Sequence, residues 1–352
     1  MILPDSQAAT LVLLVISLLC WGSWANTLKL AGKWRFELYY YDFAIGFLVL
    51  AVVAAFTGGT LNSRELTFQD NFLVSGYRNF AYAIAAGIIF NAGNMLLAAA
   101  ISLAGMAVAF TAAFATALVV STAWTLIFDT SNGIVLSLGG AVLLLAALVL
   151  GAVAYSGYLN ARAAAAKKDI PQVDPRERRV QTPRSPNAAL PIALSVVGGI
   201  ALGLFRPLLD AARQTDAGVA PYGLALLFGA GIFLSTTIID PFFFTFPVAG
   251  GPIGLAHYFK GTGKQHMLGL LGGVIAGAAF LAGMLALGAA ASARTAAMPG
   301  YALSQGGPVL AVAWGLFVWR EFRSGSERST LLFLLMWVLL AVGVGLLAVA
   351  KR

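Results

Sequence analysis

Apolar runs of about 20 residues recur along this 352-residue chain from one end to the other. A helix of that length crosses about 30 Å of hydrocarbon, because each residue adds about 1.5 Å. Charged residues make up only 10% of the chain and apolar residues 60%, whereas about a quarter of a soluble domain is charged. The sequence therefore predicts an all-α polytopic membrane protein.

We predict ten spans, with one long polar segment between the fifth and the sixth. The spans are Ala8–Leu28, Leu38–Thr57, Phe80–Ile101, Met106–Phe128, Gly133–Ser156, Pro191–Leu209, Pro221–Asp240, Met267–Leu287, Ala297–Val318 and Leu331–Ala350. The polar segment, 158–190, is rich in Lys, Arg and Pro, so we expect a solvated loop without a packed core. It separates two five-helix units, 1–157 and 191–352.

The distribution of positive charge predicts the orientation of the chain. Most of the 22 Lys and Arg residues fall in the odd-numbered loops, with the largest group in the central one. Because cytoplasmic loops carry an excess of Lys and Arg, we expect these loops inside and both termini outside a plasma or bacterial inner membrane. We attribute the net charge of +8 to this topology signal and not to nucleic-acid binding.

The two halves also share sequence features in the same order. GIIFNAG (Gly87–Gly93) matches GAAFLAG (Gly277–Gly283), and Trp124 matches Trp314 at the same offset. An odd number of spans in each half makes the second half run opposite to the first. Inverted repeats are typical of secondary transporters with a solute site near the midplane. The alternative is a simple bundle whose glycines serve close helix packing.

Five stretches carry a resemblance to a known group: CWGSWANTLKL (Cys20–Leu30), WRFELYYYDFAIG (Trp34–Gly46), FNAGN (Phe90–Asn94), AGMAVAF (Ala104–Phe110) and AWGLFVWREF (Ala313–Phe322). Through them the chain resembles the drug/metabolite transporter superfamily, in the branch of ureide permeases and bacterial glucose/rhamnose-type sugar uptake proteins. The resemblance covers nearly everything except the central loop. It implies ten helices in two inverted halves around a central solute cavity. The first predicted span lacks the carboxylate that small multidrug relatives use for proton exchange.

Amide side chains inside the predicted spans are candidates for solute binding. Asn91 lies at the centre of the third span, and Asn94 follows one turn later on the same face. Intramembrane polar residues are usually functional, and carboxamides both donate and accept hydrogen bonds. We therefore predict a site for an uncharged ureide, nucleobase-like compound or sugar, completed from the other half by Gln305. The alternative is that these amides only bond neighbouring helices.

Six aromatic residues are further candidates: Phe90, Phe280, Trp21, Trp24, Trp124 and Trp314. Phe90 and Phe280 are equivalent in the repeat and near the span centres, where they either stack on a planar solute or pack in the core. The four tryptophans lie nearer span ends, where interfacial aromatic belts are expected. Trp124 and Trp314 are repeat-equivalent on opposite membrane sides, which leaves paired gates as an alternative.

Two acidic residues near span ends, Asp42 and Asp240, are candidates for coupling transport to protons, although the sequence favours solvated interface positions for both. Enzyme functions fit poorly. His257 and His266 lack zinc-ligand spacing, and KGTGKQ (Lys260–Gln265) departs from the phosphate-binding loop pattern. The lone Cys20 excludes a Cys-rich metal site. We predict neither a metal nor a cofactor.

Together these features predict a secondary transporter that moves a small polar organic solute across the lipid bilayer by alternating access. Proton coupling is one option for its energy source. An exporter of drugs or metabolites with the same fold is the alternative function.

Overall fold

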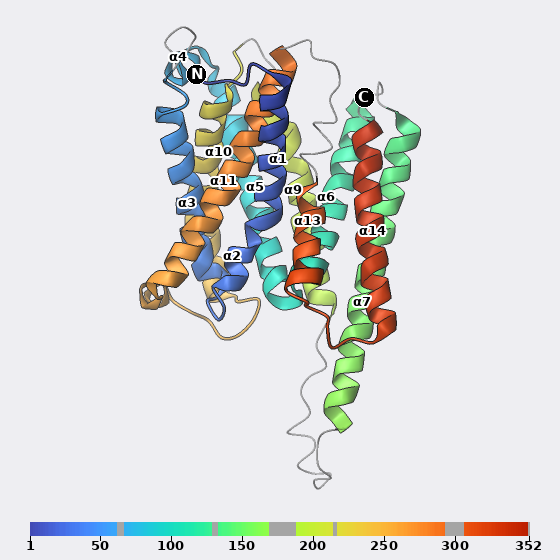
Figure 1. Cartoon of the computed structure of the whole chain (residues 1–352). Helices are drawn as coiled ribbons and strands as arrows, with labels where there is room; N and C mark the ends of the chain where they lie inside the picture. Colours follow the sequence, from blue (N-terminus) through green and yellow to red (C-terminus); the bar gives the residue numbers. More distant parts are fainter. Residues whose placement is uncertain (62–66, 129–132, 169–187, 214–216, 293–305, 351–352) are drawn as a thin grey trace.

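The computed structural model describes residues 1–61, 67–128, 133–168, 188–213, 217–292 and 306–350, and it is built from helices (Figure 1). Within these ranges nine helices are long and apolar enough to cross a membrane, and a shorter apolar helical stretch covers Gly307–Val318. The prediction of a polytopic α-helical membrane protein is confirmed.

Each half contributes its own set of elements. The first half holds α1 (Gln7–Ser23), α2 (Ala25–Leu30), α3 (Phe36–Phe56), α4 (Phe68–Val74), α5 (Tyr77–Ala104), α6 (Met106–Phe128) and α7 (Ile134–Lys168). The second half holds α9 (Ala189–Arg213), α10 (Pro221–Thr245), the 3-10 helix η1 (Leu255–Lys260), α11 (Gly263–Ser292), α13 (Gly307–Ala313), the π-helix η2 (Trp314–Val318) and α14 (Glu327–Ala350).

Nine of the predicted spans coincide with long helices, and the differences lie at the ends. The ninth predicted span, Ala297–Val318, begins in 293–305, which lie outside the described residues; its described part is α13 followed by η2. The surface helix α4 is an addition to the prediction. It starts with a capping box in which Thr67 and Asp70 satisfy each other's backbone N–H groups.

Helices from the two halves interleave. Helix α5 packs against α9 and α10, while α11 packs against α1 and α3. Helix α6 contacts α9, and α13 contacts α1. Helices α7 and α14 pair with each other at one side of the bundle (Figure 1). This arrangement leaves α1, α5, α6, α9, α11 and α13 around one central region.

Glycines permit the closest of these crossings. A Cβ atom on Gly87 of α5 would collide with the backbone oxygen of Phe228 in α10, and one on Gly199 of α9 with the backbone oxygen of Ala113 in α6. Small residues let membrane helices approach each other closely. These glycines therefore have the packing role that the sequence suggests for them.

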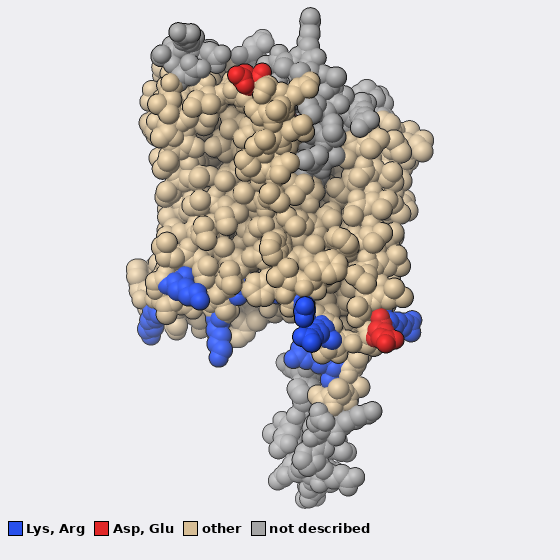
Figure 2. All heavy atoms as spheres, viewed as in Figure 1, with Lys and Arg blue, Asp and Glu red and all other residues tan. Residues whose placement is uncertain are grey.

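Lys and Arg side chains gather at one end of the molecule, where α7 projects, in the face that Figure 2 shows. Both chain ends lie at the opposite end (Figure 1). We call these the basic end and the terminal end. Assigning the basic end to the cytoplasm rests on the positive-inside rule and stays a prediction.

Candidate functional site

A cavity of about 110 Å³ lies between helices from both halves. Roughly 10–15 Å³ of such space holds one water molecule, so the cavity accommodates several waters or a small solute. Aromatic and polar residues in its lining are Trp21, Phe90, Phe114, Phe205, Phe280, Ser17, Ser121 and Arg206. The lining residues of α9 and α11 lie in the second halves of those helices, and those of α6 lie in its middle. Because α9 starts at the basic end, the cavity lies toward the terminal end.

Aromatic rings form part of an otherwise largely aliphatic cavity wall. The ring centre of Phe90 lies 5.6 Å from that of Trp21 and 5.2 Å from that of Phe228. Phe280 stacks on the same Phe228, with ring centres 4.2 Å apart and planes at 16°. The structure thus brings Phe90 and Phe280, one from each half, into one aromatic cluster beside the cavity. Flat rings in this setting suit a planar solute.

Few polar groups reach the cavity. The Ser17 hydroxyl already donates to the carbonyl of Ala279 at 2.8 Å. Arg206 supplies a guanidinium group whose Nε lies 3.4 Å from Asp210. Arg206 is not among the predicted ligands, although a charge inside the apolar run of the sixth span is itself a signal. Ser121 adds a hydroxyl from α6.

The two predicted amides do not line this cavity. Asn91 donates to Ser235 at 2.9 Å and to Thr236 at 3.0 Å, which joins α5 to α10. Asn94 donates to the Tyr40 hydroxyl at 2.8 Å, which joins α5 to α3. Both amides are buried. They form a separate polar cluster next to the aromatic one, and their binding of solute stays a prediction.

Asp240 belongs to the same buried region. Its exposed fraction is 0%, and neither carboxylate oxygen has a hydrogen-bond partner among the described residues. The Asn91 side-chain oxygen is likewise unpartnered there. The solvated interface position that the sequence favours for Asp240 is wrong, because Asp240 is part of α10, which packs against α3 and α5, and its side chain is buried there.

Asp42 is also buried, contrary to the same expectation, but each of its carboxylate oxygens has a hydrogen-bond partner. It accepts a hydrogen bond from the Tyr258 hydroxyl at 2.6 Å, and its second oxygen lies 2.8 Å from His266 Nδ1. Burial, and next the bond to Asp42, raise the pKa of the Tyr258 hydroxyl, which therefore stays protonated. Asp42 thus anchors η1 and the start of α11 to α3.

The tryptophans fall into different environments. Trp21 lines the cavity, whereas Trp24 is buried against Phe43 and Phe110. Trp124 is 43% exposed, while Trp314 donates from its indole to the Ser23 hydroxyl at 3.2 Å. Trp124 and Trp314, which the predicted repeat pairs, therefore have unlike surroundings. Gln305 lies outside the described residues.

The basic end is tied together around Glu321. Its two oxygens accept hydrogen bonds from the backbone N–H groups of Met106 at 2.8 Å and Ala107 at 3.0 Å. A carboxylate is favourable at this N-terminus of α6 because of the helix dipole. Lys29 pairs with the same carboxylate, and Trp319 donates to the Asn26 side chain at 2.7 Å. The end of the AWGLFVWREF stretch, which follows η2, thus connects α2 to the N-terminus of α6.

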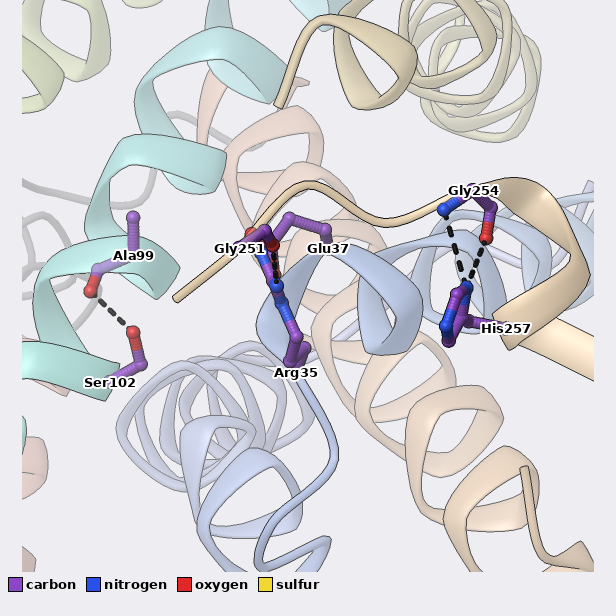
Figure 3. Close-up of polar contacts among 7 residues, drawn as sticks. All are labelled: Arg35, Glu37, Ala99, Ser102, Gly251, Gly254 and His257. Atoms are coloured by element: carbon purple, nitrogen blue, oxygen red, sulfur yellow. Dashed lines mark hydrogen bonds and ion pairs between the residues drawn. The ribbon is translucent and has the colours of Figure 1, made fainter. Parts of the chain in front are cut away.

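A second tie at this end holds the loop that follows α10. Arg35 donates to the backbone oxygen of Gly251 at 2.7 Å and pairs with Glu37 at 2.6 Å (Figure 3). In the same loop, the ring nitrogen of His257 lies within 3.3 Å of the Gly254 backbone N–H (Figure 3). These two sets of contacts thus connect segments at the basic end, whereas the cavity lies toward the terminal end.

Comparison with known proteins extends these observations. No protein-family model matches the chain. Ureide permease 5 of Arabidopsis thaliana is 24% identical to it over 97% of this chain and 94% of that protein. Ureide permease 4 of the same plant is 23% identical over 99% of this chain and 98% of that protein. The chain is similar to ureide permeases along its whole length.

These relatives are named permeases, which agrees with the expectation that the chain is no enzyme. One solved crystal structure of a protein aligns with 99% of the chain at a TM-score of 0.50, with 16% sequence identity and 99% of that chain covered. That likeness concerns the fold alone.

Proposed function

We propose that the chain is a secondary transporter that moves a small polar organic solute across the membrane by alternating access. The observation that carries this proposal is the cavity with aromatic side chains that both halves line, while polar contacts around Glu321 and Arg35 connect segments at the basic end. The nine apolar helices and the full-length similarity to permeases support a membrane transporter for small solutes.

The helix contacts support two inverted repeats. Let α1, α3, α5, α6 and α7 correspond to α9, α10, α11, α13 and α14. The contact of α5 with α9 then maps onto that of α11 with α1, and the contact of α6 with α9 onto that of α13 with α1. The contact of α5 with α10 maps onto that of α11 with α3. Such repeats are a common basis of alternating access.

Among the solute classes, the cavity favours a planar ureide or nucleobase-like compound over a sugar. Its aromatic side chains offer stacking surfaces, and the Arg206 guanidinium donates hydrogen bonds that carbonyl groups of such compounds accept. The relatives are named for ureides, which points to the same class.

For coupling, we favour Asp240 over Asp42 as the proton carrier. An unpaired charge buried in a membrane protein is costly, and a bound proton removes that charge. The ionisable groups that interact with Asp240 are Glu37, Tyr40 and Tyr41, all of α3. Those of α5, such as Tyr77 and Arg78, lie at its opposite end. Asp42, in contrast, already has two partners.

Uptake into proteoliposomes tests the proposed function. We expect a radiolabelled ureide such as allantoin to accumulate under an imposed proton gradient, more than uracil or glucose, and an uncoupler to abolish the accumulation. Absence of transport for all three solute classes, in protein that remains folded, would contradict the proposal. Extrusion instead of uptake under the same gradient would favour the exporter alternative.

A further inference from the structure

A second cavity, of about 360 Å³, lies at the basic end between η2, the segment that follows it and α14. It shares no lining residue with the solute cavity. The lining residues that matter here are Leu316, Phe317, Arg320, Arg323, Thr330 and Leu334. Phe322 and Phe333 also contribute, stacked with ring centres 4.0 Å apart. The cavity is thus apolar except for two arginines and one hydroxyl.

Both arginines are uncompensated. Neither Arg320 nor Arg323 makes a side-chain hydrogen bond or ion pair with any described residue. The acid between them, Glu321, is occupied by Lys29 and by the N-terminus of α6. Arg320 also has φ of 50°, a region that side-chain-bearing residues rarely adopt and that often marks functional sites. The cavity therefore carries positive charge without a protein partner.

The opposite side of the cavity faces the lipid region. Phe317 is 48% exposed and Leu334 is 37% exposed. Leu334 belongs to a stripe of exposed apolar residues along one face of α14 that also includes Leu335, Val338 and Val342. In a membrane-spanning helix such a stripe contacts acyl chains. The cavity thus joins an acyl-chain surface to two unpaired guanidinium groups at the membrane boundary.

We propose that this cavity binds an anionic phospholipid. The phosphate lies between Arg320 and Arg323, whose planar guanidinium groups match phosphate oxygens, and one acyl chain follows the α14 stripe. Basic pockets between membrane helices bind such head groups. Because Glu321 lies between the two arginines in the chain, the bound lipid stabilises the closed basic end. This inference does not depend on which solute is transported.

Thermal unfolding of the purified protein in detergent tests the proposal. We expect added phosphatidylglycerol to raise the melting temperature, while phosphatidylcholine and inorganic phosphate leave it unchanged. The double variant Arg320→Gln/Arg323→Gln should need at least about tenfold more phosphatidylglycerol for the same shift, which corresponds to about 1.4 kcal/mol. The matched control Lys260→Gln/Lys264→Gln removes two exposed charges from the same end and should respond like the wild type.

Several results would overturn the proposal. An unchanged phosphatidylglycerol response in the double variant would show nonspecific attraction, as would an equal loss in the control. An equal shift with inorganic phosphate would show a site for soluble anions. If the double variant does not fold, Arg323→Gln and Leu334→Trp take its place. Leu334→Trp fills the cavity at constant charge and should also lose the response, and a retained response in both would contradict lipid binding there.

Discussion

Phe280 lines the proposed solute cavity, and its ring stacks on that of Phe228. We expect Phe280→Ala to raise the KM for a planar solute between about twofold and tenfold, because an aromatic contact contributes about 0.5–1.5 kcal/mol beyond its buried area. Concentration-dependent uptake in proteoliposomes measures this change. Phe128→Ala is the matched control, since Phe128 is 69% exposed on α6 and lines no part of the cavity. Equal KM values for all three proteins would remove Phe280 from the site.

Asp240 gives a prediction about coupling. Asp240→Asn keeps the size of the side chain but removes its ability to carry a proton. We expect accumulation driven by a pH gradient to be lost, while exchange of labelled for unlabelled solute continues. Asp5→Asn, at an exposed position near the N-terminus, should leave both activities intact. Gradient-driven accumulation at the wild-type level in Asp240→Asn would assign coupling to another group.

The sequence predicts the surroundings of some single residues and not of others. Phe90 and Phe280 are predictable as a pair, because the sequence match between the two halves relates them, and both line one cavity. Asp42 and Asp240 are not, since their position near a span end says nothing about the neighbouring helices that bury them. Asn91 and Asn94 are predictable as buried polar groups, but their partners Ser235, Thr236 and Tyr40 come from other helices.

Helix α6 depends on its N-terminal contact with Glu321. Glu321→Gln keeps one acceptor oxygen but places an NH2 donor where the other oxygen accepts a backbone N–H bond, and it leaves Lys29 without its ion-pair partner. We expect a loss of about 1–3 kcal/mol in stability, the range for hydrogen bonds to charged groups, seen as a lower melting temperature. Adding Lys29→Met should recover part of this loss, because the unpaired charge is then removed. Strictly additive effects of the two substitutions would contradict a direct interaction.

The crossing of α5 and α10 depends on Gly87, where any Cβ meets the backbone of Phe228. Gly87→Ala should therefore lower the stability by about 1–3 kcal/mol, the usual cost of overpacking. Gly345→Ala in α14 is the matched control, because its Cβ would meet no atom within 4 Å. Thermal unfolding of the two variants compares them. Equal melting temperatures would mean that the helices separate at little cost.

At the scale of elements, hydropathy and length are sufficient to predict nine long helices, since each must satisfy its backbone within the membrane. No comparable pattern in the sequence predicts the π-helix η2 or the break between α1 and α2 at Trp24. Both lie beside the ties of the basic end, where Trp319 bonds Asn26 and Lys29 pairs with Glu321. Their geometry is set by contacts between distant segments, which a single sequence does not reveal.

For the molecule as a whole, the repeat predicts which helices correspond, but not which become neighbours. The neighbours determine the cavity: α5 and α6 of the first half meet α9 of the second, and α1 meets α11 and α13. This arrangement places the solute cavity toward the terminal end and the polar ties at the basic end. Under the proposed alternating access, this arrangement corresponds to a conformation that is closed at the basic end.

Alternating access predicts that the cavity opens to one side of the membrane and then to the other during transport. In a Cys20→Ala background, which removes the single native thiol, a cysteine introduced by Ser121→Cys should react with a membrane-impermeant maleimide from the terminal side. Ser102→Cys, at an exposed position near the basic end, should react only from the other side. Adding Glu321→Gln weakens the basic-end closure, so labelling of Ser121→Cys should slow severalfold. Unchanged labelling would show that Glu321 supports the fold without controlling access to the cavity.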